Sequence, residues 1–169
     1  MKLKRLTLCG VLTAVSLTIF VLEAQLPPLL PVPGVKLGLA NLITLFALLY
    51  LPPKETCLIL LARILLGTVF TASPATLLYS LTGGFFCLGA ELILMKFWHI
   101  QDIWAISTVG AMVHNLGQLI AAAFVTKTLF VFWYLPILLI FGILTGLFTG
   151  FCIHLYHRRF GNRMKQFLS

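Results

Sequence analysis

The hydrophobic pattern of this chain consists of long apolar runs separated by short groups of prolines and charged residues. Six runs can be delimited, at about 6–22, 35–51, 56–70, 75–95, 103–125 and 135–156. A hydrocarbon core about 30 Å thick needs roughly 20 apolar helical residues, and every run approaches that length, 56–70 being the shortest. The pattern predicts an all-α integral membrane protein, a bundle of six transmembrane helices in one domain over residues 1–169.

The composition supports a membrane environment. Hydrophobic residues make up 60% of the chain and charged residues only 9%, which excludes an ordinary soluble domain. The net charge of +8 is typical of nucleic-acid-binding proteins, but the basic residues lie at the chain ends and in short loops. We therefore expect these basic residues to face the surface of a lipid bilayer, and we expect no nucleic-acid partner.

The distribution of basic residues predicts the orientation. With six spans, only Lys36 and Lys127 fall on one side of the membrane. The other side receives Lys2, Lys4, Arg5, Lys54, Lys96, Arg158, Arg159, Arg163 and Lys165. Positive residues favour the cytoplasmic side, so both termini are predicted to be cytoplasmic. The first run resembles a signal peptide but has no Ala-x-Ala site before Pro27, so we interpret it as a retained helix.

Motifs for catalysis and for metal binding are missing from the sequence. The four cysteines lie inside apolar runs without metal-ligand spacing, which predicts packing residues, with neither disulfide nor metal. No phosphate-binding glycine loop is present, so the chain is not expected to hydrolyse ATP itself. Asp102 is the only aspartate, which excludes the Asp-rich pairs that hold magnesium on a diphosphate. We predict no enzyme activity, no catalytic residue and no cofactor.

Two charged residues are predicted to lie inside the membrane. Arg63 is near mid-membrane by its distance from Lys54, and Glu91 lies within about one helical turn of that depth on the next span. A buried charge needs a partner, so we expect a structural Arg63–Glu91 ion pair. The alternative is that Arg63 binds the ligand.

A second polar group gathers at the outer half of the predicted bundle. His114 and Gln118 share a helix face with Asn115 beside them, and the other members come from the first and second runs. The predicted substrate-binding residues are Lys36, Asn41, His114, Asn115, Gln118 and Glu23. The alternative is that these side chains only hydrogen-bond one another and hold helices together. Lys36 and the amides favour a ligand with a carboxylate or a phosphate.

Small residues mark two helix-approach faces. Gly142, Gly146 and Gly150 recur every four residues in the last run, and Gly10 and Ala14 do so in the first. Contacts within the bundle are the simpler expectation for both faces. The alternative for Gly10 and Ala14 is a docking site for another membrane subunit.

Four segments, 33–41, 62–67, 80–84 and 110–118, resemble the Gx transporter family, often labelled heptaprenyl diphosphate synthase component I. That family is similar to the S components of energy-coupling-factor (ECF) transporters. The resemblance implies a multi-pass protein of a bacterial cell membrane, with six helices, that binds a small-molecule substrate from outside. It also implies docking, through Gly10 and Ala14, on an ECF-type transmembrane subunit with two ATPases supplied in trans.

The expected function is therefore that of a substrate-binding S component that captures a small micronutrient-like molecule. The alternative is a non-catalytic membrane subunit associated with heptaprenyl diphosphate or quinone-precursor synthesis. A third possibility is a structural membrane protein without a ligand.

Overall fold

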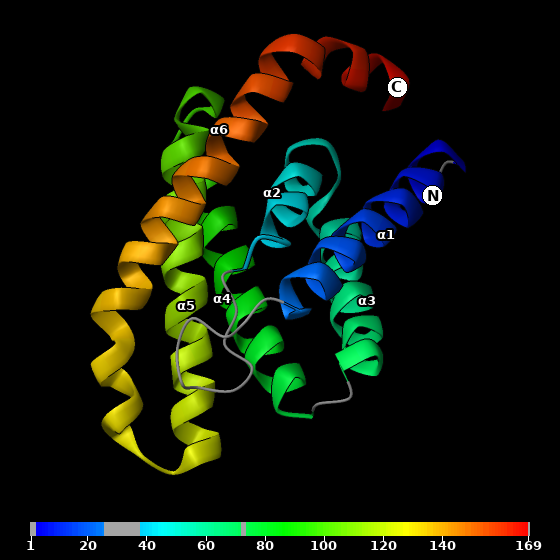
Figure 1. Cartoon of the computed structure of the whole chain (residues 1–169). Coiled ribbons are helices and arrows are strands. Elements are labelled where there is room, and N and C mark those ends of the chain that lie inside the picture. Colours follow the sequence, from blue (N-terminus) through cyan, green and yellow to red (C-terminus); the bar gives the residue numbers. More distant parts are fainter. Residues whose placement is uncertain (1–2, 26–37, 72–73, 169) are drawn as a thin grey trace.

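The computed structural model describes residues 3–25, 38–71 and 74–168 (Figure 1). Within these residues the chain forms α-helices and short 3-10 helices and no strand, which confirms the all-α prediction. The elements are α1 (Leu3–Gln25), α2 (Asn41–Tyr50), α3 (Pro53–Thr71), α4 (Pro74–Phe97), η1 (Ile100–Asp102), α5 (Ile103–Thr126), η2 (Leu129–Tyr134) and α6 (Leu135–Leu168).

The helix ends follow from local chemistry. Leu51, which precedes a proline, is extended with φ −120° and ψ 153° and ends α2. Pro53 and Pro74 are the first residues of α3 and α4, where a missing N–H breaks no helical hydrogen bond. Lys127 ends α5 in the left-handed conformation with φ 52°.

Four helical stretches in the described residues are long and apolar enough to span a membrane: Leu3–Gln25, Pro74–Phe97, Ile100–Thr126 and Leu129–Leu168. The other two helices differ. α3 has 19 residues but carries Lys54, Glu55 and Arg63. α2 has only 10 residues, about 15 Å, or half the thickness of a hydrocarbon core.

The predicted second span, 35–51, is therefore helical over a shorter stretch than expected. Residues 35–37 lie outside the described residues, and Gly38 has a φ of 81°, a conformation that an α-helix does not contain. The backbone then turns, with the Asn41 N–H donating to the Gly38 carbonyl, and α2 begins.

The short helix α2 lies in the centre of the molecule, between the α1–α3 pair and the α4–α5–α6 group (Figure 1). Its side chains enter three separate hydrophobic clusters. Ile43 and Ala47 pack with residues of α1 and α3, Leu45 with α5 and α6, and Leu48 with α3 and α4. This position brings the N-terminal end of α2 into the interior of the bundle.

α5 and α6 meet along a glycine face. A Cβ at Gly146 would overlap the backbone of Thr108, and one at Gly142 would lie 3.0 Å from Asn115 Nδ2. Ser107 and Thr149 hydrogen-bond across the same contact at 2.7 Å. The expectation that the α6 glycines make contacts within the bundle is confirmed.

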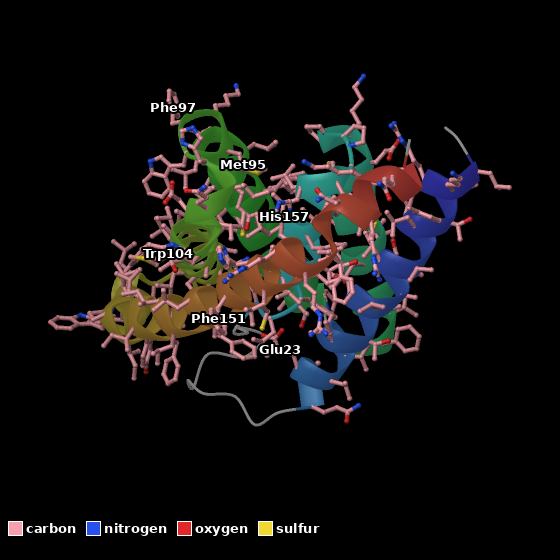
Figure 2. The ribbon with its side chains drawn as sticks, turned by 90° about the horizontal axis from the view of Figure 1, so that it is seen from above. Glu23, Met95, Phe97, Trp104, Phe151 and His157 are labelled. Atoms are coloured by element: carbon pink, nitrogen blue, oxygen red, sulfur yellow. The ribbon has the colours of Figure 1, made fainter. Side chains whose placement is uncertain are left out.

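The outside of the bundle is strongly apolar. Phe124 and Trp133 are 81% exposed and Val69 is 77% exposed. Figure 2 places Trp104 and Phe151, which are about half exposed, along the outside of the α5–α6 pair. Such a surface suits contact with lipid.

Candidate functional site

Buried polar side chains gather around the N-terminal end of α2. They surround a cavity of about 10 Å³, which is the room that one water molecule needs. Helices α1, α3, α4 and α5 and the turn before α2 all contribute to its wall. The lining residues are Phe20, Glu23, Gly38, Ala40, Asn41, Arg63, Ser80, His114 and Gln118.

Arg63 of α3 reaches Asn41 at the start of α2. Both terminal guanidinium nitrogens donate to Asn41 Oδ1 at 3.2 Å, and the guanidinium carbon lies 5.9 Å from the centre of the Phe20 ring. The cation is only 2% exposed, so these contacts replace water around it. The predicted Arg63–Glu91 ion pair is therefore corrected: the hydrogen-bond partner of Arg63 is an amide.

Glu91 instead interacts along its own helix. Its Oε1 accepts from the Cys87 thiol at 3.4 Å, and its Oε2 has no hydrogen-bond partner. Gly110 of α5 lies against this carboxyl, since a Cβ there would be 2.9 Å from Oε1. The carboxyls of Glu91 and Glu23 both act electrostatically on Arg63.

Glu23, near the C-terminal end of α1, holds the turn that leads into α2 (Figure 2). Its Oε1 accepts a hydrogen bond from the Gly38 N–H at 2.6 Å. A charged acceptor makes this bond short and strong. Glu23 therefore connects α1 to the cavity wall, and Asn41 continues the connection to α3.

His114 of α5 occupies a slot between two glycines. A Cβ at Gly38 would lie 2.9 Å from His114 Cδ2, and a Cβ at Gly83 would lie 2.8 Å from Cε1 and from Nδ1. The ring is 3% exposed, and neither nitrogen makes a hydrogen bond of acceptable geometry, although the Gly83 backbone faces it.

Gln118 lies one turn beyond His114 and lines the same cavity, as do Asn41 and Glu23. Asn115 does not. Its Nδ2 donates to the Leu138 carbonyl of α6 at 2.7 Å, and it packs against Gly142. Adjacent helical residues point about 100° apart, so Asn115 faces α6 while His114 faces the cavity. The placement of Asn115 in the pocket is corrected on this ground.

Three other candidate residues lie away from the cavity wall or outside the description. Lys36 falls outside the described residues. Gly10 and Ala14 lie on an exposed face of α1, and a Cβ at Gly10 would meet nothing within 4 Å.

The sequence pattern predicts no cavity role for several of the lining residues. Arg63 was assigned mainly to an ion pair, and Ser80, Phe20 and Gly38 to none. Gly83 also went unassigned, although it shapes the histidine slot. The available signal was the concentration of small residues at 80–84, which marks a close approach of helices.

The chemistry that this arrangement offers is binding. It combines one cation, a carboxylate, an imidazole and amides in a water-poor space, where each hydrogen bond is strong. Among the residues that the structure describes, no three His, Cys, Asp or Glu side chains are placed to hold a metal ion.

Comparison with known proteins places this sequence in a family. Residues 12–156 match the family described as heptaprenyl diphosphate synthase component I. The chain belongs to this family. No curated protein and no solved structure matches the sequence. The family description names a component, which implies a partner in a complex, and the apolar helices imply a lipid bilayer.

Proposed function

We propose that this member of the family is the substrate-binding membrane subunit of an ECF-type importer. It captures a small micronutrient-like molecule from outside and docks on a transmembrane subunit energised by two ATPases. In this proposal all six helices lie in the membrane, with α2 as the short central one. The observation that carries the proposal is the buried polar cavity at the start of α2.

Lipid provides no hydrogen-bond partners, so burying a polar group inside a membrane protein costs free energy unless another group in the protein or a ligand satisfies it. Mutual hydrogen bonding explains Asn41 and Glu23. It does not explain Arg63 Nε, which has no acceptor, or the two His114 nitrogens, which face the Gly83 backbone without a hydrogen bond of acceptable geometry. Groups that the fold leaves unsatisfied around one cavity favour a ligand over a purely structural role.

The orientation of the chain supports binding from outside. Both termini lie toward the same end of the molecule as the C-terminal end of α4, and the α5–α6 turn lies at the opposite end (Figure 1). With the positive-inside preference, the terminal end is cytoplasmic.

The surface of α1 supports docking. α5 packs directly against the glycines of α6. Gly10, in contrast, is exposed, and an added Cβ there would meet nothing within 4 Å. A small-residue face left open on a membrane helix admits the close approach of a partner helix.

One observation favours the alternative, a non-catalytic membrane subunit for prenyl diphosphate synthesis, which the family description also names. An apolar groove of about 310 Å³ lies between α1, α2 and α6. Its lining residues are Leu12, Leu42, Ile43, Phe46, Cys152, Ile153 and Tyr156. A groove of this character suits a hydrocarbon chain.

Affinity purification from native membranes tests the proposal. The tagged chain is compared with Gly10→Leu and with Val11→Leu, a matched change at a neighbouring exposed position. We expect the wild-type and Val11→Leu proteins to recover a second membrane subunit and an ATPase pair, and Gly10→Leu to lose both while remaining folded. Recovery of a soluble prenyl synthase alone supports the alternative.

A further inference from the structure

The unsatisfied groups at the cavity form a pattern that a ligand must complement. His114 is held by Gly38 and Gly83 on two sides, so its ring has little freedom to turn toward another partner. As a neutral imidazole it presents one N–H donor and one bare nitrogen acceptor. The Gly83 backbone faces the ring, but neither nitrogen makes a hydrogen bond of acceptable geometry within the described chain.

Arg63 adds one more donor. Its two terminal nitrogens share Asn41 Oδ1, and its Nε–H is buried without an acceptor. A ligand that satisfies both side chains therefore needs a hydrogen-bond acceptor for the N–H groups and a donor for the imidazole nitrogen that carries no hydrogen.

The charges around the cavity argue against an anionic ligand. The carboxyls of Glu23 and Glu91 both act electrostatically on Arg63, and Glu23 lines the cavity itself. An added carboxylate or phosphate would bring a further negative charge beside Glu23 in a medium of low dielectric, where like charges repel strongly. The sequence predicts an anionic ligand from Lys36 and the nearby amides, and Lys36 lies outside the described residues.

We propose that the cavity between Arg63 and His114 binds an uncharged ligand through an amide-type edge, a carbonyl beside an N–H, as in a lactam or a ureide. The carbonyl oxygen accepts from Arg63 Nε–H, and the ligand N–H donates to the bare nitrogen of His114. The cavity of about 10 Å³ admits that oxygen, and the rest of the ligand requires a wider opening between the helices that line it. The inference rests on the proposed function, because it names the substrate class of the same site.

Matched small probes test this on the purified chain in lipid nanodiscs. 2-Pyrrolidone and 2-imidazolidinone carry the amide edge, N-methyl-2-pyrrolidone lacks the N–H, and acetate and inorganic phosphate carry an oxyanion. We expect the first two to raise the thermal unfolding midpoint at millimolar concentration. The other three should not do so at matched ionic strength. Equal responses to the methylated lactam, stronger responses to the anions, or no response to either amide probe would overturn the inference.

Two histidine variants locate the effect. His114→Phe keeps a flat ring without nitrogens, and we expect it to weaken binding of 2-imidazolidinone by about tenfold or more. His154→Phe, on α6 outside the cavity, is the control and should bind as the wild type does. Unchanged binding by a folded His114→Phe protein contradicts the proposal. If His114→Phe does not fold, the comparison of the two pyrrolidones still decides the point.

The probe experiment and the affinity purification test the two proposals separately. Recovery of the ATPase pair without amide binding removes this inference and leaves the proposed function. Amide binding without those partners removes the ECF role and leaves a ligand site.

Discussion

At the scale of single residues, the contact between Asn41 and Arg63 decides how the bundle tolerates a buried cation. Arg63 is 2% exposed and its terminal nitrogens have one acceptor, Asn41 Oδ1. A hydrogen bond to a charged group contributes more to stability than one between neutral groups, and removing Asn41 leaves the buried guanidinium without this acceptor.

A double-mutant cycle measures this contact. Asn41→Leu should lower the free energy of unfolding by about 1.5–3 kcal/mol because the guanidinium loses its acceptor. Arg63→Met in the Asn41→Leu background should recover part of that loss, since the buried charge is gone. The measurement is thermal unfolding in detergent. Additive effects of the two changes would show that the contact contributes nothing.

Gly83 is predicted to be irreplaceable for steric reasons. In Gly83→Ala the new methyl group would lie 2.8 Å from two atoms of the His114 ring, which must move. We expect a loss of about 1–3 kcal/mol of stability. Gly89→Ala on the same helix is the control, because its Cβ would meet nothing within 4 Å, and helix propensity favours alanine there. If both variants unfold at the same temperature, the tight histidine slot does not exist.

The sequence brings together several residues that line one cavity, and their role in binding a substrate stays a prediction. Asn41, His114, Gln118 and Glu23 do line one cavity. Polar residues in an apolar chain are conspicuous, and a spacing of four residues fixes a shared face. The side that Asn115 faces could not be predicted in this way. The sequence fixes the angle between adjacent residues on one helix, but it does not show which other helix packs against each face.

At the scale of elements, the position of α2 was the feature hardest to predict. Hydrophobicity continues from residue 35 to residue 51, and periodicity alone cannot show that the helix begins only at Asn41. The turn at Gly38 depends on the Glu23 carboxylate, which comes from another element. The Arg63 partner was misjudged for the same reason, since helical depth counts cannot show that α2 brings Asn41 to Arg63.

The α5–α6 contact should be the least tolerant of added volume. A methyl group in Gly146→Ala would overlap the Thr108 backbone, which cannot rotate away as a side chain can. We expect a loss of about 1–3 kcal/mol, measured as a lower midpoint of thermal unfolding. Gly10→Ala, with open space around its Cβ, should match or exceed the wild type. An unaffected Gly146→Ala protein would mean that α6 sits farther from α5.

At the scale of the whole molecule, the apolar exterior and the buried polar centre reverse the pattern of a soluble domain. Phe124 and Trp133 are far more exposed than Glu91 or Gln118. Hydrophobicity predicted the membrane class because composition alone carries that information. The predicted orientation rests on the basic residues, and in the proposed function it determines from which side a ligand would reach the cavity.

Cysteine labelling tests that orientation. Lys127→Cys and Lys96→Cys are made in a chain whose own cysteines, at 9, 57, 87 and 152, are replaced by alanine. Both lysines are exposed; Lys96 lies in the last turn of α4, before α5 begins, and Lys127 lies at the C-terminal end of α5. The positive-inside preference puts Lys96 in the cytoplasm, so a membrane-impermeant maleimide should label only Lys127→Cys on intact cells and both proteins after the membrane is opened. Labelling of Lys96→Cys alone on intact cells would reverse the topology. The ligand cavity would then be reached from the cytoplasm, and capture from outside would be excluded.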